Sequence, residues 1–218
     1  SGHVGAGINL LRDHAGLLTT YKLMATYSYH INLGDDHQRL HFGISAGGVQ
    51  HRLDYQGVSG DLNDPSLYNY NQDNSMKFEA DAGAAYTDGK LNLQVAFPNI
   101  IANARKEPGN VINRTTFFSA ASYQWKPAGG DAGVSITPKV AYRRMKGTDD
   151  ILDAGINIGF LGEVLNVYGL YHSTKNLTAG FNLHLFGQLD ILAGYTTQTK
   201  ELKSSSNGDL SFGLRYSF

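Results

Sequence analysis

The sequence predicts an all-β fold, an antiparallel transmembrane β-barrel of about twelve strands that forms one outer-membrane domain over residues 1–218. The main observation is a period-two alternation of apolar and polar side chains, typical of pleated strands with one oily and one wet face. The composition agrees, because 26 Gly and 13 Tyr accompany only 17% charged residues, which favours strands and turns over helices. No apolar run approaches the roughly 18 to 20 residues of a membrane helix.

The alternation is clearest in five segments, each of which predicts a strand. In the first, Val4, Ala6, Ile8 and Leu10 alternate with Gly and other polar residues. The five segments are residues 4–10, 21–33, 152–160, 177–185 and 210–218.

Turn signals rich in Gly, Asp and Asn separate the segments. Two longer polar stretches, Gln56 to Ser75 and Ile101 to Arg114, interrupt the regular spacing. Short turns at one end and longer loops at the other are expected of an outer-membrane barrel. The predicted turns are Arg12–Gly16, Gly34–Asp36, Asp88–Gly89, Ala128–Asp131, Lys146–Asp149, Thr174–Asn176 and Ser204–Gly208.

Two strands contain an irregularity. The apolar register shifts at Gly47 and Gly48, which predicts a β-bulge there. Pro138 lies within an otherwise regular strand and cannot donate to the ladder, so we expect that strand to be bent or locally open.

The character of the polar face favours a membrane barrel over a soluble one. That face carries mostly Gly, Ser, Thr and Asn, and twelve strands are too many for an interior filled by apolar side chains. Aromatic residues near strand ends form the pattern of interfacial girdles. The alternative is a soluble two-layer β-protein with Tyr-rich edges. The girdle candidates are Tyr21, Tyr27, Tyr29, Tyr86, Phe97, Tyr123, Trp125, Tyr142, Tyr195 and Tyr216.

The last strand indicates which membrane. Gly213, Tyr216 and the terminal Phe218 resemble the C-terminal assembly signal of bacterial outer-membrane barrels. No signal peptide is visible, so we expect a mature or trimmed chain. If two N-terminal strands were trimmed, the full barrel would have about fourteen, the even number expected of bacterial barrels.

Histidines and charged residues are the candidates for lumen chemistry. A hairpin centred on Asp35 and Asp36 would place His30 opposite His41 and Asn32 opposite Arg39. Two His side chains could form half of a metal site, but with no third ligand in view a polar lumen pair is favoured, and no metal or other cofactor is expected. The other lumen-lining candidates are Glu79, Asp81, Lys139, Arg143, Asp153, Asp190 and Arg215.

These charges admit two interpretations: a selectivity lining for a solute, or ion pairs that fill a narrow barrel. The second is favoured because buried charges must be paired. We expect no enzyme, since no His-Glu-x-x-His motif is present. A net charge of -1 argues against nucleic-acid binding, and the absence of Cys excludes disulfides and Cys-ligated metals.

One loop is a candidate for contact with a partner. The stretch from Asp61 to Asp73 is polar and aromatic, and its candidate contact residues are Asp64, Pro65, Tyr68 and Tyr70. The alternative is a solvated loop without such a role.

Short motifs along the whole chain resemble the PorP/SprF family of Bacteroidetes. The segments that carry the resemblance are residues 40–52 (LHFGISAGGVQHR) with Asp64-Pro65, 81–86 (DAGAAY), 91–98 (LNLQVAFP), 137–142 (TPKVAY), 193–195 (AGY) and 213–218 (GLRYSF). The chain departs from the family at Tyr171-His172, where members usually have Tyr-Arg.

The resemblance implies an outer-membrane component of the type IX secretion system. Such proteins help to export or anchor cell-surface proteins, including gliding-motility adhesins, through protein–protein contacts. The implied partners are outer-membrane lipid and secretion components or the C-terminal domains of secreted substrates, with no small-molecule substrate. The alternative function is an outer-membrane porin or small-solute channel, which the polar lumen would suit.

Overall fold

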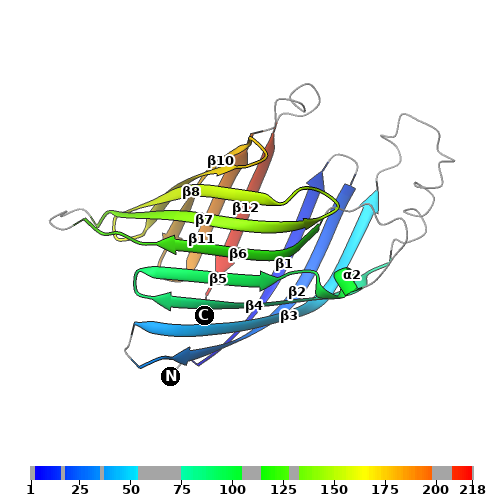
Figure 1. The fold of residues 1–218 in the computed structure, drawn as a ribbon, viewed down its shortest axis with the longest axis horizontal. Coiled ribbons are helices and arrows are strands. Elements are labelled where there is room, and N and C mark those ends of the chain that lie inside the picture. The colour runs from blue at the N-terminus through cyan, green and yellow to red at the C-terminus, as the bar shows by residue number, and fades with distance from the viewer. Residues whose placement is uncertain are drawn as a thin grey trace. The chain divides into compact units, whose positions relative to one another are not determined.

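The computed structural model of the chain describes residues 3–15, 18–34, 37–53, 75–104, 114–127, 133–197 and 208–217. These residues form twelve strands in one antiparallel sheet whose strand order follows the chain from β1 to β12 (Figure 1). The predicted all-β class and strand number are therefore confirmed. The strands are β1 Val4–Ala15, β2 Leu18–Asn32, β3 Gln38–Leu53, β4 Lys77–Asp88, β5 Leu91–Phe97, β6 Arg114–Tyr123, β7 Ser135–Lys146, β8 Ile151–Phe160, β9 Leu165–His172, β10 Leu177–Leu185, β11 Leu189–Thr196 and β12 Asp209–Tyr216, and the short helix α2 spans Ile100–Ala104.

The predicted closed barrel is not seen: among the described residues the sheet stays open between β1 and β12. β1 pairs with β2 and β12 pairs with β11, and no pairing of β1 with β12 occurs among the described residues. A closed barrel needs that pairing, because it alone would satisfy the outer N–H and C=O groups of the two end strands.

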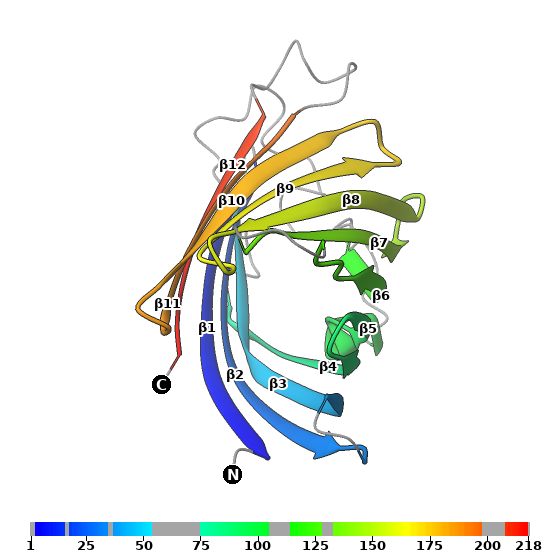
Figure 2. The same cartoon turned by 90° about the vertical axis from the view of Figure 1, so that its left-hand side faces the viewer.

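The sheet divides into two compact units, one built on β1–β4 with α2 and the other on β7–β12. In the first unit, β1, β2 and β3 lie side by side and are among the longest strands (Figure 2). The β2–β3 ladder pairs His30 with His41 and Asn32 with Arg39, which confirms the register predicted for this hairpin.

The β-bulge predicted at Gly47 and Gly48 is absent from the ladder between β2 and β3. The β2–β3 ladder runs without a break from Leu18↔Leu53 to Asn32↔Arg39. The glycines serve close approach instead, since a Cβ on Gly47 would collide with the Leu23 carbonyl oxygen and lie 2.9 Å from the Met24 Cα. The loss of apolar side chains at this point therefore reflects tight backbone contact between two strands.

Pro138 likewise does not interrupt the ladder that it shares with β8. It pairs with Ile156, and the register is continuous from Ser135 to Arg143. The predicted opening is absent on this side of the strand, because a proline lacks only the N–H and its carbonyl can still accept.

Two predicted connections differ from the structure. β1 continues through Ala15, so most of the predicted turn at Arg12–Gly16 is strand paired with Leu18–Tyr21. Part of the predicted loop Ile101–Arg114 is helical, since it contains most of α2. The predicted turns near Asp88–Gly89, Lys146–Asp149 and Thr174–Asn176 separate strands as expected.

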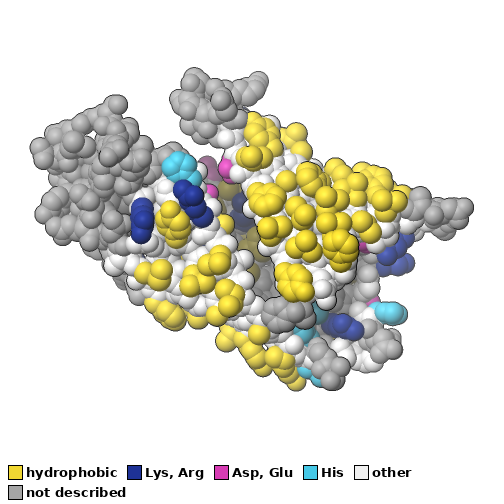
Figure 3. Space-filling view, turned by 180° about the vertical axis from the view of Figure 1, so that it is seen from behind, with side chains coloured by type: hydrophobic (Ala, Val, Ile, Leu, Met, Phe, Trp, Pro, Cys, Tyr) yellow, Lys and Arg dark blue, Asp and Glu magenta, His cyan; other side chains and the backbone are white. Residues whose placement is uncertain are grey.

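The distribution of apolar and polar side chains between surface and interior is the reverse of that in a soluble protein. Among the described residues the buried hydrophobic side chains are few and mostly small, namely Met24, Ala120 and Ala141. Polar and charged side chains are buried instead, and large apolar ones cover much of the surface shown in Figure 3. The most exposed strand residues include Ile8 and Leu10 on β1 and Leu210, Phe212, Leu214 and Tyr216 on β12.

An exposed apolar face and a buried polar face are expected of strands that face lipid on one side. No helix among the described residues is long and apolar enough to span a bilayer.

Candidate functional site on the polar face

The polar face of the first unit carries the predicted histidine pair. His30 on β2 and His41 on β3 are half-buried, with their Nδ1 atoms 2.7 Å apart and their rings edge to face. Further along the same face, the Thr26 and Ser45 hydroxyls are 2.7 Å apart. Directly opposed cross-strand positions place these side chains within contact. No group of three or more His, Asp or Glu side chains that could hold a metal occurs in the described part of the chain.

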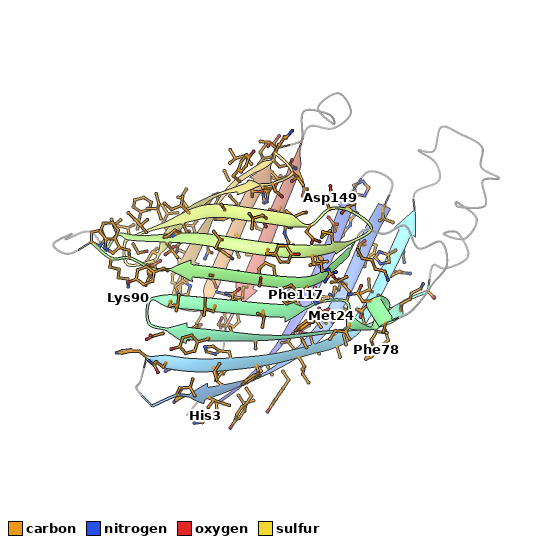
Figure 4. All side chains as sticks on the ribbon, in the orientation of Figure 1. His3, Met24, Phe78, Lys90, Phe117 and Asp149 are labelled. Atoms are coloured by element: carbon orange, nitrogen blue, oxygen red, sulfur yellow. The ribbon has the colours of Figure 1, made fainter. Side chains whose placement is uncertain are left out.

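Two acidic side chains of β4 hold the segment around α2. Glu79 is 4% exposed, and its carboxylate accepts hydrogen bonds from the N–H groups of Ile101 (2.8 Å) and Ala102 (3.0 Å). These donors lack partners within such a short helix, so the carboxylate satisfies them and is itself stabilised. The neighbouring Phe78, labelled in Figure 4, is 58% exposed, as alternation along β4 requires.

Asp81 connects Asn99, the residue just before α2, to β2. Its Oδ1 accepts from the Asn99 N–H at 2.8 Å and its Oδ2 forms an ion pair with the Lys22 Nζ at 2.7 Å. Asn99 has a φ of 56°, a conformation that Asn tolerates better than most residues. The contacts of Glu79 and Asp81 therefore anchor this segment to the polar face of the first unit.

In the second unit, Asp153 on β8 is the centre of a charged cluster. The carboxylate is bound by Arg143 on β7, at 2.8 Å from Oδ2, and by His172 on β9, at 2.5 Å from Oδ1. The His172 ring is oriented by Thr178 on β10, 2.7 Å from its Nε2. Asp153 is 5% exposed, so these partners replace the water that a buried carboxylate loses.

Asp190 on β11 is the centre of a second cluster with the same composition. It contacts the Nδ1 of His184 on β10 at 2.8 Å and the Nη2 of Arg215 on β12 at 2.6 Å. Both clusters thus place an Asp on a central strand, a His on one neighbouring strand and an Arg on the other. The arrangement cross-links three adjacent strands through their polar faces.

The nine predicted lumen residues therefore divide into clusters rather than forming one site. His30 pairs with His41, Glu79 and Asp81 hold the α2 segment, Arg143 pairs with Asp153, and Asp190 pairs with Arg215. Lys139 lies opposite Gly155 and is half-buried, outside the two Asp-centred clusters. Ion pairs of this kind are what the second interpretation, a barrel filled by paired charges, requires; that interpretation and the selectivity lining both stay predictions.

Sequence reasoning missed Lys22, His172 and His184, which complete these clusters. The available signal was register, because Asp153 stands directly opposite His172 and His184 directly opposite Asp190. The turns of these hairpins fix their registers in the same way as the turn between His30 and His41 does.

Two sets of predicted residues can be placed only in part. The partner-loop candidates Asp64, Pro65, Tyr68 and Tyr70, like Phe218 of the assembly strand, lie outside the described residues. Gly213 pairs with Leu192 on β11, and Tyr216 donates to the Gln188 Oε1 at 3.1 Å.

We expect Asp150, which lies between β7 and β8, to make a pH-dependent contribution to the free energy of unfolding. The hydrogen bonds donated by the Tyr142 hydroxyl (2.5 Å) and by the Met145 N–H (3.1 Å), together with the charge of Arg144, hold the pKa of Asp150 below its usual value. Because the folded pKa is the lower one, the contribution is present above the unfolded value of about 4 and is lost as the pH falls through the folded value.

We therefore expect Asp150→Asn to lower the urea midpoint slightly at pH 7 and to leave it unchanged at a pH below both pKa values. The measurement is urea unfolding of both proteins in detergent at the two pH values. An equal difference at the two pH values would contradict the assignment.

The comparisons with known proteins point to one family. A family model described as type IX secretion system membrane protein PorP/SprF matches residues 1–216. The search of curated proteins found no match. A match over nearly the whole chain, on an antiparallel sheet with an exposed apolar face, shows that the chain belongs to the PorP/SprF family of type IX secretion system membrane proteins.

Proposed function

We propose that the chain is an outer-membrane β-barrel of the type IX secretion system that helps to export or anchor secreted proteins through protein–protein contacts. The observation that carries the proposal is the family match over residues 1–216. It is supported by the exposed apolar face, which suits contact with lipid. In this proposal β1 and β12 pair in the bilayer, because lipid does not tolerate open strand edges.

The contact role has a direct test in Tyr68 and Tyr70, the aromatic candidates of the stretch from Asp61 to Asp73. An epitope-tagged full chain, purified in mild detergent from its own cells, is expected to bring down other secretion components, identified by mass spectrometry. Tyr68→Ala/Tyr70→Ala should lower their yield severalfold, since aromatic side chains dominate many interfaces. Lys175→Ala, in the β9–β10 turn, is the control that should keep the full yield. Isolation of the wild-type chain alone would overturn the proposal.

Trp125 allows a test of membrane insertion without a label. It is the chain's only Trp, it is 53% exposed, and it lies just beyond β6 in an isolated bridge with Ile136. A Trp at a strand end on the apolar face belongs at the bilayer interface. We expect lipids brominated near the headgroup to quench its fluorescence more than lipids brominated deep in the acyl chain.

A relocated Trp serves as the control for that measurement. Gly7 lies on the polar side of β1, and no atom lies within 4 Å of the position that its Cβ would take, so Trp125→Phe/Gly7→Trp moves the reporter to the other face. Brominated lipid should then quench it weakly. Equal quenching at both positions would contradict the assignment of the two faces.

A solute channel is the second candidate, and the polar face favours it. His30 and Lys22, on the polar face of the first unit, are part-buried polar groups that could line a water-filled path. Planar-bilayer recording decides between the two, because a channel gives discrete conductance steps and a barrel filled by ion pairs gives none.

A further inference from the structure

A cationic group borders the apolar face of the first unit. Arg12 on β1 and Arg52 on β3 both approach the ring of Tyr21 on β2, with their guanidinium carbons 5.8 Å and 5.4 Å from its centroid. Arg12 stands directly opposite Tyr21, and Arg52 stands opposite Thr19, diagonal to it. Two cations are thus held over one aromatic side chain by the register of three strands.

The group lies on the apolar side of the sheet. Along β1 it follows Ile8 and Leu10, each 78% exposed, and along β2 it precedes Leu23, which is 45% exposed. Arg12 and Arg52 are themselves exposed. Figure 3 shows Lys, Arg and His side chains gathered beside the apolar surface of the face in view.

Asp13, the acidic residue next to Arg12 on β1, does not neutralise the cationic group, because it lies on the other face of the sheet. Asp13 is next to Arg12 in the strand, so alternation sends its side chain to the polar face. His14 returns to the apolar side, where its Nδ1 lies 2.9 Å from the Thr19 hydroxyl. The apolar side of β1 therefore ends in cationic and polar groups.

The group lies at the level that headgroups would occupy. The exposed apolar run from Leu23 to Ile31 on β2 covers about 26 Å of strand at about 3.3 Å per residue. Strands of an outer-membrane barrel are tilted, and a strand that spans the bilayer at a tilt of about 45° has about 9–11 residues, which the run from Leu23 to Ile31 matches. Tyr21 is the next residue of the same face beyond one end of this run, where an aromatic girdle meets lipid phosphates.

We propose that Arg12, Tyr21 and Arg52 form a binding site for the phosphate headgroup of an anionic lipid. Guanidinium groups bind phosphate in a bidentate manner, and stacking on an aromatic ring pre-organises them. The lipid's acyl chains would lie on Leu10 and Leu23, next to the group. The inference rests on the proposed membrane location, because it requires that the apolar face contact lipid.

The test is lipid binding by the full chain in detergent, followed by native mass spectrometry. The probes are dioleoyl phosphatidylglycerol, lipid A and, as the zwitterionic reference, dioleoyl phosphatidylcholine. Wild-type protein should retain phosphatidylglycerol or lipid A in preference to phosphatidylcholine. Arg12→Gln and Arg52→Gln should each lower this preference about fivefold, since one basic side chain near the membrane surface contributes about 1 kcal/mol to the binding of anionic lipid. The two substitutions together should lower it about thirtyfold.

A matched control is Arg144→Gln. Arg144 also lies at a strand end of the sheet but is close to the carboxylate of Asp150, so we expect its loss to leave the preference unchanged. Arg12→Lys/Arg52→Lys keeps the charge without the planar fork and should give an intermediate preference.

Two outcomes would overturn the site. One is an unchanged preference in Arg12→Gln/Arg52→Gln, and the other is binding of free inorganic phosphate as tight as that of the lipids. Quenching of Trp125 by brominated lipid, measured on the same variants, separates the two proposals. If Trp125 is still quenched in Arg12→Gln/Arg52→Gln and the lipid preference of that variant equals that of the wild type, only the lipid site is rejected. If Trp125 of the wild-type protein is not quenched, the membrane location is rejected and the lipid site with it.

Discussion

Gly47→Ala is expected to lose the folded state. A Cβ at this position would collide with the carbonyl oxygen of Leu23 and lie 2.9 Å from the Met24 Cα. Both groups belong to the backbone of β2, which is bonded to β3 along the whole ladder, so no change of rotamer can relieve the contact. Overpacking a rigid site costs about 1–3 kcal/mol, and a backbone collision in a ladder of this length should reach at least the upper end.

Gly43→Ala is the matched control for that experiment. Gly43 lies on the same strand and face, and the nearest atom to its Cβ position is the Tyr27 carbonyl oxygen at 3.9 Å, an ordinary contact. The measurement is refolding into detergent micelles, followed by the mobility of unheated samples in gel electrophoresis and by the urea midpoint. Equal refolding of Gly47→Ala and Gly43→Ala would show that the two strands separate easily, and would contradict the close approach.

Asp153→Asn is expected to destabilise the second unit by about 2–4 kcal/mol. The substitution keeps the shape of the side chain but leaves the positive charge of Arg143 without its partner. It also replaces one of the two acceptor oxygens shared by Arg143 and His172 with an NH2 group that can only donate. Breaking a fully buried ion pair costs about 3–5 kcal/mol. The Arg143 side chain is 33% exposed, so water offsets part of that cost.

The control for this cluster is Asp150→Asn, an acidic side chain three residues away in the β7–β8 turn with the same change of charge. It should shift the urea midpoint much less than Asp153→Asn at pH 7. A further variant, Asp153→Leu/Arg143→Met, removes both charges and should recover part of the lost stability, because a matched apolar pair avoids an unpaired buried charge. Equal midpoints for Asp153→Asn and the wild type would mean that the cluster contributes nothing.

The hairpin of β2 and β3 shows how far local reasoning reaches. The turn at Asp35 and Asp36 predicted which residues face each other, and His30 and His41 do so. Register within a hairpin follows from the turn and from alternation, both of which are local in sequence. The same reasoning, applied to the β8–β9 and β10–β11 turns, would have found the His partners of Asp153 and Asp190.

The role of Gly47 and the helix at Ile100–Ala104 could not be predicted from local sequence patterns. A pair of glycines at a phase shift indicates either a bulge or a close approach of backbones, and only the distance to β2 distinguishes them. The helix α2 is five residues long, too short to form without tertiary partners. Glu79 accepts from the helix and Asp81 from the residue before it, whereas the sequence predicts these carboxylates only as lumen-lining charges.

The sequence by itself determined which side chains share a face, how many strands the chain forms and which side of each strand is apolar, because alternation repeats every two residues and needs no knowledge of the rest of the fold. Only the tertiary structure decided that Arg143 reaches Asp153 and that Arg52 reaches the ring of Tyr21. Both contacts are diagonal across neighbouring strands, and the twist of the sheet sets diagonal distances, which no single strand encodes.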